Sequence, residues 1–229
     1  MKLNRNSEKP VCNEKSERTG SLYAHKALVI GLTGGIATGK TTVACIFDEL
    51  GAKVVSADDI VHELLQPGTD VSREVVEVFG KDILKEDGSI DRRRLGGIVF
   101  RDPEKKARLE AIIHPHVIEC LEKIAQEFHK KDSGVLILEI PLLIETSLIS
   151  LVDKVLVVTV EQETQIDRLE KRYGVSREEA ILRIKAQLPM SEKLKHADWV
   201  ASTDGTLGAT KEQVERIWYA IQKSLAQPK

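Results

Sequence analysis

The stretch ALVIGLTGGIATGKTT, residues 27–42, decides how the rest of the chain is interpreted. It opens on an apolar run, Ala27 to Ile30, of the kind that forms a buried strand. Gly34 to Thr41 then read G-x-x-x-x-G-K-T, and the residues from Thr41 to Leu50 have helical periodicity. A Gly-rich loop between a strand and a helix turns several backbone N–H groups toward one anion, and the helix N-terminus adds partial positive charge. The stretch therefore predicts a phosphate loop that binds a nucleoside triphosphate.

The predicted nucleotide-binding residues are those of the loop and the start of the helix beyond it. They are Gly34, Gly35, Ile36, Ala37, Thr38, Gly39, Lys40, Thr41 and Thr42. Lys40 is expected to reach the β- and γ-phosphates, where its charge makes it a candidate for catalysis as well as for binding. The hydroxyl of Thr41 is expected to hold Mg²⁺.

Composition and charge narrow the class of protein. Of the 229 residues, 41% are hydrophobic and 31% are charged, which is typical of a soluble globular protein. A net charge of −2 and a pI near 6.3 give no basic surface for nucleic acid. No apolar run approaches a membrane span, the N-terminus lacks the apolar core of a signal peptide, and the widely spaced cysteines suggest neither disulfides nor a zinc site. We expect a cytoplasmic monomer without nucleic-acid or membrane partners.

Short apolar runs along the chain predict an α/β fold of the P-loop NTPase type, with a five-stranded parallel sheet. The predicted strands fall at residues 27–32, 53–56, 135–140, 154–160 and 197–201. Two further segments are helical. The first follows the second strand and is expected to hold the acceptor; the second is a pair of short charged helices expected to close as a lid that excludes water. The resulting divisions are a disordered extension at 1–25, a nucleotide-binding core at 26–60, 134–161 and 191–229, a helical acceptor domain at 61–133 and a lid at 162–190.

The helical insertion contains a predicted break. Asp102-Pro103 indicates an N-cap followed by proline at the first helical position, and the helix that it opens is expected to end at His114-Pro115. Another helix is expected to carry on from there to about Lys130. A histidine at such a break is more often a structural cap than a catalytic group, so we expect His114 to contact the acceptor rather than to catalyse.

Carboxylates follow two of the predicted strands, at the edge of a parallel sheet where ligands collect. Asp58 and Asp59 come after the second strand, and such a pair would supply a general base for the attacking hydroxyl or would cap a helix beginning near Ile60. Asp58 is nearer the strand end and is the better candidate for the base, whereas both roles stay open for Asp59. Glu139, near the end of the third strand, is placed to touch Mg²⁺ through water.

Arg168 and Arg172 stand four residues apart in the first lid helix and therefore share a face. They would grip ATP phosphates when the lid closes, or they would form a solvated face paired with Asp167 or Glu170. The preceding predicted strand aims this helix at the phosphate loop, and the sequence leaves the two interpretations even.

Taken in order and spacing, several motifs between about residues 28 and 205 resemble those of the dephospho-coenzyme A (dephospho-CoA) kinase family. The motifs are LTGGIATGKTT, SADDIVHELLQPG, DGSIDRRRLGGIVFRDPEKKARLEAIIHP, IPLLIE, ETQIDRLEKR, RIKAQ and Ala197-Asp198. The resemblance implies transfer of the γ-phosphoryl group of ATP, with Mg²⁺, to the ribose 3′-hydroxyl of dephospho-CoA, the last step of coenzyme A synthesis. It also implies an architecture similar to that of the nucleoside monophosphate kinases, with a core, an acceptor domain and a lid.

The resemblance also implies roles for particular residues. Lys40, Asp58 and Arg168 would be catalytic, with Asp58 as the base, and Arg172 would join the ATP-binding residues. The residues implied to bind the acceptor are Asp58, Arg92, His114, Pro115, Pro141 and Leu142. Arg92 and the two arginines after it would meet the acceptor's diphosphate, or they would form an exposed basic turn.

Three positions depart from the family pattern. Ala37 replaces a loop glycine, so the loop must tolerate a Cβ there, and Ser56 replaces an acid, which leaves Asp58 as the only carboxylate of that motif. Thr203 replaces an asparagine, which puts the adenine contacts nearby in question. Two other functions stay open: a kinase for another small alcohol or nucleotide, and a nucleotide-dependent switch without turnover.

Overall fold

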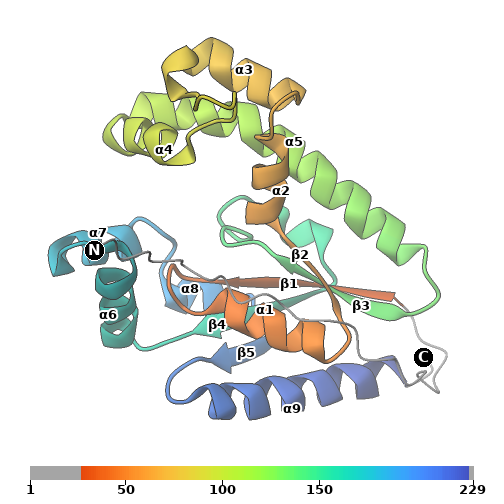
Figure 1. The fold of residues 1–229 in the computed structure, drawn as a ribbon. Helices are drawn as coiled ribbons and strands as arrows, with labels where there is room; N and C mark the ends of the chain where they lie inside the picture. The colour runs from red at the N-terminus through yellow and green to blue at the C-terminus, as the bar shows by residue number, and fades with distance from the viewer. Residues whose placement is uncertain (1–26, 227–229) are drawn as a thin grey trace, which may run out of the picture.

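One parallel sheet organises the fold. In the computed structural model, which describes residues 27–226, five strands are hydrogen-bonded in the order β2-β3-β1-β4-β5 (Figure 1). Their bounds are β1 Ala27–Gly34, β2 Lys53–Ser56, β3 Gly134–Glu139, β4 Lys154–Thr159 and β5 Trp199–Ser202. The predicted five-stranded parallel sheet is confirmed, and each strand lies within two residues of its predicted bounds. The extension predicted at residues 1–25 lies outside the described residues.

The centre of the sheet is β1, which pairs in parallel with β3 on one side and β4 on the other. Its apolar residues are buried except for Leu28, which is partly buried, as is usual for a strand with helices on both faces of the sheet. In the register of the sheet, Glu139 of β3 lies opposite Leu32 of β1 and Ser56 of β2. The carboxyl ends of these three strands therefore meet at one edge, where the chain leaves β1 for the phosphate loop.

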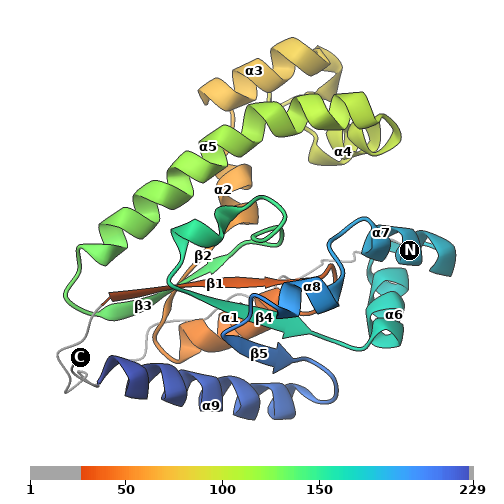
Figure 2. The ribbon, with the colours of Figure 1, turned by 180° about the vertical axis from the view of Figure 1, so that it is seen from behind.

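Helices cover both faces of the sheet (Figures 1 and 2). The helices of the described residues are α1 Lys40–Glu49, α2 Ala57–Leu64, α3 Asp70–Phe79, α4 Arg92–Arg101, α5 Pro103–His129, α6 Gln162–Tyr173, α7 Arg177–Lys185, α8 Met190–Leu194 and α9 Leu207–Leu225. α1 and α9 pack on one face of the sheet, and α2 and α5 join the apolar cluster on the other, with α3 and α4 beyond them. None of these helices is long and apolar enough to cross a membrane.

α5 is one continuous helix of 27 residues, so the break predicted at His114-Pro115 is wrong. Pro115 lies inside it, where a proline has no N–H for the carbonyl four residues earlier and ordinarily costs about 3 kcal/mol. Packing on both sides of the proline offsets this cost. The side chains buried there in one apolar cluster are Ile112, Ile113, Val117 and Leu121.

The helix after β2 also starts earlier than predicted. α2 begins at Ala57 rather than near Ile60, and its N-cap is Ser56. Asp58 and Asp59 therefore lie in its first turn, where the helix dipole favours acidic residues, and neither caps it. The capping role that the sequence left open for Asp59 is thus wrong.

The basic run at residues 92–94 is helical and does not form the exposed turn that was one of its two interpretations. It is the first turn of α4, and Asp91 caps it by accepting from the N–H groups of Arg93 and Arg94, both at 3.0 Å. Leu95, buried one turn along, packs in the same cluster as the inner face of α5. Capping and packing together hold a helix that contains two consecutive glycines.

α6 and α7 form a helical pair beside the phosphate loop, in the segment predicted as a lid (Figure 1). The apolar centre of this pair is small and consists of Ile166, Leu169 and Ala180. Ile36 and Ala37 of the phosphate loop pack against it. The loop and the helical pair thus share one apolar cluster, separate from the two clusters on the sheet.

Candidate active site

The phosphate loop, residues 34–41, joins β1 to α1 in the strand–loop–helix arrangement that the sequence predicts. Gly39 precedes the helix with φ 85°, in the left-handed region where glycine has no Cβ penalty. Ala37 has φ 58° in the same region, where a residue with a Cβ is strained by about 1–2 kcal/mol. The loop therefore accommodates Ala37, because contacts with neighbouring elements hold its strained backbone conformation.

Five successive carbonyl groups of the loop accept hydrogen bonds. The donors are Lys40 Nζ for Gly34 (3.1 Å) and Gly35 (2.8 Å), Gln165 Nε2 for Ile36 (2.5 Å), Arg168 Nη1 for Ala37 (3.3 Å) and Thr203 Oγ1 for Thr38 (2.7 Å). The N–H groups of Ile36 and Thr38 are also bonded, to Gln187 and to the carbonyl of Gly35. With these groups engaged, the N-terminus of α1 is left to attract an anion.

Lys40 lies in surroundings that disfavour its charged form. Burial lowers the pKa of its ammonium from 10.5 to about 8, because removal from water disfavours the charged form. Glu139 and Asp58 oppose this change in the pKa of Lys40, whereas Lys193 adds to it. Lys40, Glu139 and Asp58 therefore form one electrostatic cluster at the carboxyl edge of the sheet.

Thr41, the predicted magnesium ligand, donates from its hydroxyl to Glu139 Oε1 at 3.0 Å. Glu139 is only 7% exposed, and burial raises the pKa of its carboxyl, although the Thr41 hydroxyl and Lys40 act against this rise. A hydroxyl and a carboxylate side by side are hard oxygen donors, the type that Mg²⁺ prefers. The sequence indicated Thr41 strongly and Glu139 only weakly, and the structure brings the two together.

Asp58, the candidate base, lies exposed in the first turn of α2. Its charge raises the pKa of both Lys40 and Glu139, so it stands within electrostatic reach of both. Asp59 also acts on the pKa of Glu139, but less than Asp58 does. Of the two carboxylates, Asp58 therefore has the stronger electrostatic influence on the groups beside the phosphate loop.

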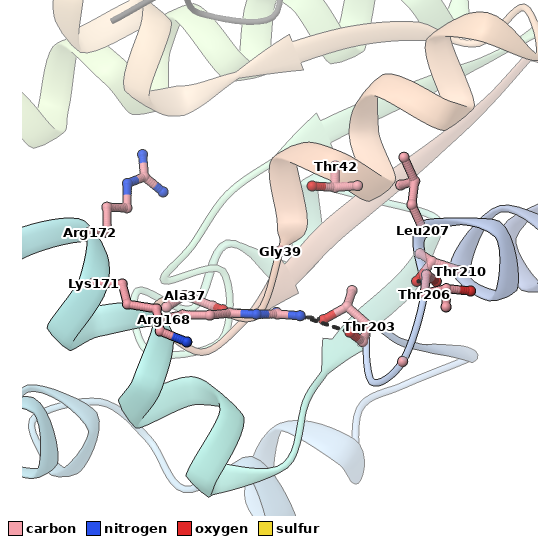
Figure 3. Close-up of a pocket in the computed structure, with 11 residues that line it drawn as sticks. Ala37, Gly39, Thr42, Arg168, Lys171, Arg172, Thr203, Thr206, Leu207 and Thr210 are labelled. Atoms are coloured by element: carbon pink, nitrogen blue, oxygen red, sulfur yellow. Dashed lines mark hydrogen bonds between the residues drawn. The ribbon is translucent and has the colours of Figure 1, made fainter. Parts of the chain in front are cut away.

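A cavity of about 540 Å³, a volume usual for small-ligand sites, opens beside the loop (Figure 3). Its lining residues are Ala37, Gly39, Thr42, Arg168, Lys171, Arg172, Thr203, Gly205, Thr206, Leu207 and Thr210. The cavity thus lies between the phosphate loop, α6 and the segment that connects β5 to α9.

Arg168 extends across this cavity to Thr203 and donates to its Oγ1 and its carbonyl oxygen, both at 2.8 Å (Figure 3). The interpretation of Arg168 as part of a solvated face paired with Asp167 or Glu170 is therefore wrong. Arg172 is exposed, points in a different direction, and lies 5.4 Å from the ring of Tyr173. The two arginines share a helix but have different surroundings.

Arg92, predicted to bind the acceptor, reaches from α4 to α2. Its Nη1 lies 3.1 Å from Nδ1 of His62. His62 stands four residues after Asp58 and therefore lies on the same face of α2, about 6 Å further along the helix. The structure thus brings Arg92 within about one helical turn of the candidate base.

The other predicted acceptor residues lie in two places. Pro141 and Leu142 follow β3, and the carbonyl oxygen of Pro141 accepts from Thr33 Oγ1 at 3.1 Å, which fixes it at the carboxyl edge of the sheet. His114 and Pro115 are exposed in the middle of α5. The His114 side chain makes no hydrogen bond or ion pair with any residue in the range 27–226.

Sequence reasoning missed several residues that contact the site. Gln165 and Gln187 bind the backbone carbonyl and N–H of Ile36 in the loop, and His62 binds Arg92. Lys193 is fully buried and pairs with Glu145 at 2.6 Å. The signal that could have found Gln165 is its place directly before Ile166 on the apolar side of a predicted helix. An amide buried there needs a hydrogen-bond partner.

Comparisons with known proteins point to one family. A sequence profile described as dephospho-CoA kinase matches residues 28–208. A dephospho-CoA kinase of Bacillus thuringiensis is 47% identical over 190 residues, which cover 83% of this chain and 95% of that protein. A crystal structure from Thermus thermophilus has a TM-score of 0.70 at 33% identity, covering 88% of this chain and 100% of that one. The dephospho-CoA kinase structure from Campylobacter jejuni has a TM-score of 0.65 at 30% identity, covering 86% and 98%. From β1 to the start of α9, this chain belongs to the dephospho-CoA kinase family.

Proposed function

We propose that this chain transfers the γ-phosphoryl group of ATP to the ribose 3′-hydroxyl of dephospho-CoA and releases CoA and ADP. Membership in the dephospho-CoA kinase family is the observation that carries the identity of the acceptor. The geometry adds the chemistry, because Lys40, Thr41, Asp58 and Glu139 gather at one edge of the sheet beside a phosphate loop. These are the cationic, hydroxyl and carboxylate groups that phosphoryl transfer uses.

On the nucleotide side, the triphosphate would lie along the phosphate loop and the adenosine would enter the cavity between α6 and the start of α9. Phosphate oxygens would replace the carbonyls of Gly34 and Gly35 as the partners of Lys40 Nζ. Fixed positive charge at the γ-phosphoryl group stabilises the charge that develops on its oxygens in the transition state. Lys40 thus contributes mainly to the transition state.

Thr41 and Glu139 would hold Mg²⁺ between them, Thr41 directly and Glu139 through water, and their adjacent oxygens suit that ion. When bound there, the ion would supply positive charge that neutralises the phosphate oxygens of the nucleotide. Among residues 27–226 no group of three histidine, cysteine or acidic side chains forms a metal site by itself. A few protein oxygens together with substrate phosphates are the usual ligands of Mg²⁺ in a kinase.

On the acceptor side, Asp58 would accept the proton of the attacking 3′-hydroxyl. Arg92, whose Nη1 lies beside Nδ1 of His62 on the Asp58 face of α2, would meet the diphosphate on the 5′ side of the same ribose. Residues 61–133 would thus form the acceptor domain, with Pro141 and Leu142 at its border with the sheet. Arg168 and Arg172 of the α6–α7 pair would close over the phosphates and exclude water.

The test is to incubate the protein with ATP, Mg²⁺ and dephospho-CoA, measure ADP release, and identify the product by mass spectrometry. We expect ADP to form only when the acceptor is present, with one phosphoryl group added at the 3′ position. Lys40→Ala, which should fold but not turn over, serves as the matched negative control. Reactions with adenosine and AMP complete the panel, and dephospho-CoA should be preferred because its arm supplies binding energy for positioning the hydroxyl.

Two outcomes would overturn the proposal. ADP release that ignores the acceptor would indicate a nucleotide-dependent switch or hydrolase. Equal or faster phosphorylation of adenosine or AMP would leave a kinase but with a different substrate.

A further inference from the structure

Two glutamines from the α6–α7 pair hold the two peptide units that flank Ile36 in the phosphate loop. Gln165 of α6 donates from Nε2 to the carbonyl oxygen of Ile36 at 2.5 Å, and Gln187, just beyond α7, accepts at Oε1 from the N–H of Ile36 at 2.7 Å. A carbonyl can only accept and an N–H can only donate, so each amide must present its opposite end. We refer to Gln165 and Gln187 as the amide clamp.

The packing around the amide clamp is close. Gln165 is 6% exposed, and a Cβ at Gly35 would lie 2.8 Å from its Nε2, so the glycine leaves the space that the amide occupies. The side chain of Ile36 packs against the apolar centre of the α6–α7 pair. Both the backbone and the side chain of Ile36 are therefore bound to this pair.

The peptide that Gln165 holds, between Ile36 and Ala37, directly precedes the strained residue of the loop. Ala37, with φ 58°, would relax toward a more favourable backbone conformation if its neighbouring peptide were free to rotate. Such a rotation would move the N–H groups that follow it in the loop. The amide clamp therefore acts next to Ala37, the loop residue whose backbone conformation is unfavourable for a residue with a Cβ.

We propose that Gln165 and Gln187 are positioning residues that hold the two peptides flanking Ile36 and thereby keep the phosphate loop in the shape that binds the β-phosphate of the nucleotide. The clamp also fastens both ends of the α6–α7 pair to the loop, one glutamine near the start of α6 and the other after the end of α7. This inference rests on the proposed nucleotide site and is independent of the acceptor.

The test compares glutamate and methionine at the two positions. Gln165→Glu places a carboxylate against a carbonyl and loses the donor, whereas Gln187→Glu keeps an oxygen that accepts from the N–H of Ile36. Both changes add one negative charge at the same part of the loop, so charge alone predicts similar effects. Gln165→Met and Gln187→Met remove the hydrogen bonds without adding charge, and Gln162→Met, exposed at the start of α6, is the matched control.

The measurement is the Kd for ADP and for AMP, by titration calorimetry with Mg²⁺ and no acceptor. We expect Gln165→Glu and both methionine variants to weaken ADP binding by about five- to tenfold, the size of a lost hydrogen bond, and AMP binding by less than about twofold. Gln187→Glu should bind ADP better than Gln187→Met. Because neither ligand is a phosphoryl donor, the result stands whether or not dephospho-CoA is the acceptor.

Three results would overturn the inference. Gln187→Glu could prove as damaging as Gln165→Glu, ADP and AMP could weaken equally, or the methionine variants could bind ADP like Gln162→Met. If the variants do not fold, amide hydrogen exchange in the nucleotide-free wild-type protein decides instead. The N–H of Ile36 should then be protected by its bond to Gln187, and exchange at the rate of an unprotected amide would contradict the clamp.

Discussion

Replacing Lys40 by methionine should change the stability of the protein in a way that depends on pH. The ammonium is buried on the carbonyls of Gly34 and Gly35, and its pKa falls from 10.5 to about 8 on folding. Each pKa unit corresponds to about 1.4 kcal/mol, so below pH 8 the charged lysine costs the folded state about 3 kcal/mol relative to the neutral form. Lys40→Met has no such cost.

The sign follows from proton binding. Between pH 8 and pH 10.5 the unfolded chain still holds the proton of Lys40 while the folded protein has released it, so the stability contributed at this position rises with pH. The free energy of unfolding of the wild type minus that of Lys40→Met should therefore increase by about 2–3 kcal/mol between pH 7 and pH 10. Methionine cannot make the hydrogen bonds of Lys40 Nζ. Their loss changes the stability difference by the same amount at every pH and does not alter how the difference depends on pH.

The assay is urea unfolding followed by circular dichroism at four pH values from 7 to 10, for both proteins. Lys53→Met, at the exposed start of β2, is the control for removing a lysine charge from the surface. A stability difference between Lys40→Met and the wild type that stays flat, or that moves in the opposite direction, would refute the argument that burial of the ammonium dominates. The same variant should lose phosphoryl transfer, since a methionine gives no charge to the transition state.

Three further predictions concern activity, each measured by steady-state ADP release. Asp58→Asn should lower kcat by about 10²–10⁴-fold with the KM for ATP nearly unchanged, because a general base acts on the acceptor; a larger loss in Asp59→Asn would mean that the base is the other carboxylate. Arg168→Lys should lower kcat/KM for ATP by about tenfold, because one ammonium cannot reproduce the two hydrogen bonds of the guanidinium to Thr203. Wild-type kinetics in this variant would exclude a role for those two bonds. Arg92→Ala should raise the KM for dephospho-CoA by about tenfold while the KM for ATP stays constant, with Arg93→Ala, exposed on the same helix turn, as the control that must behave differently.

The sheet and the phosphate loop could be predicted from the sequence because their signals are local. A buried strand, a Gly-rich loop and a helix follow one another within residues 27–50, and the loop's chemistry depends on its own backbone. The position of Asp58 near this edge could be predicted for a similar reason, since strand ends in a parallel sheet meet at one edge.

The remainder depends on contacts between distant parts of the chain. Gln165 and Gln187 meet Ile36 across more than a hundred residues, and no spacing rule anticipates such a pairing. The proline in α5 misled the prediction because its local cost is offset by burial on both sides. The helix at residues 92–101 was missed since Gly96 and Gly97 lower its propensity, whereas the Asp91 cap and the packing of Leu95 raise its stability.

The order of the strands has a consequence for how the chain is made. The central strand, β1, finds its two neighbours only in β3 and β4, and the pairing of Ala27 with Gly134 spans 107 residues. At a synthesis rate of about 5–20 residues per second, β1 would wait about 5–20 s after it is made before β3 is made. During that interval both of its edges are unpaired and its apolar side chains are not yet buried in the sheet. Pairing over such a separation also slows refolding, so yield from dilute refolding should exceed yield from concentrated refolding.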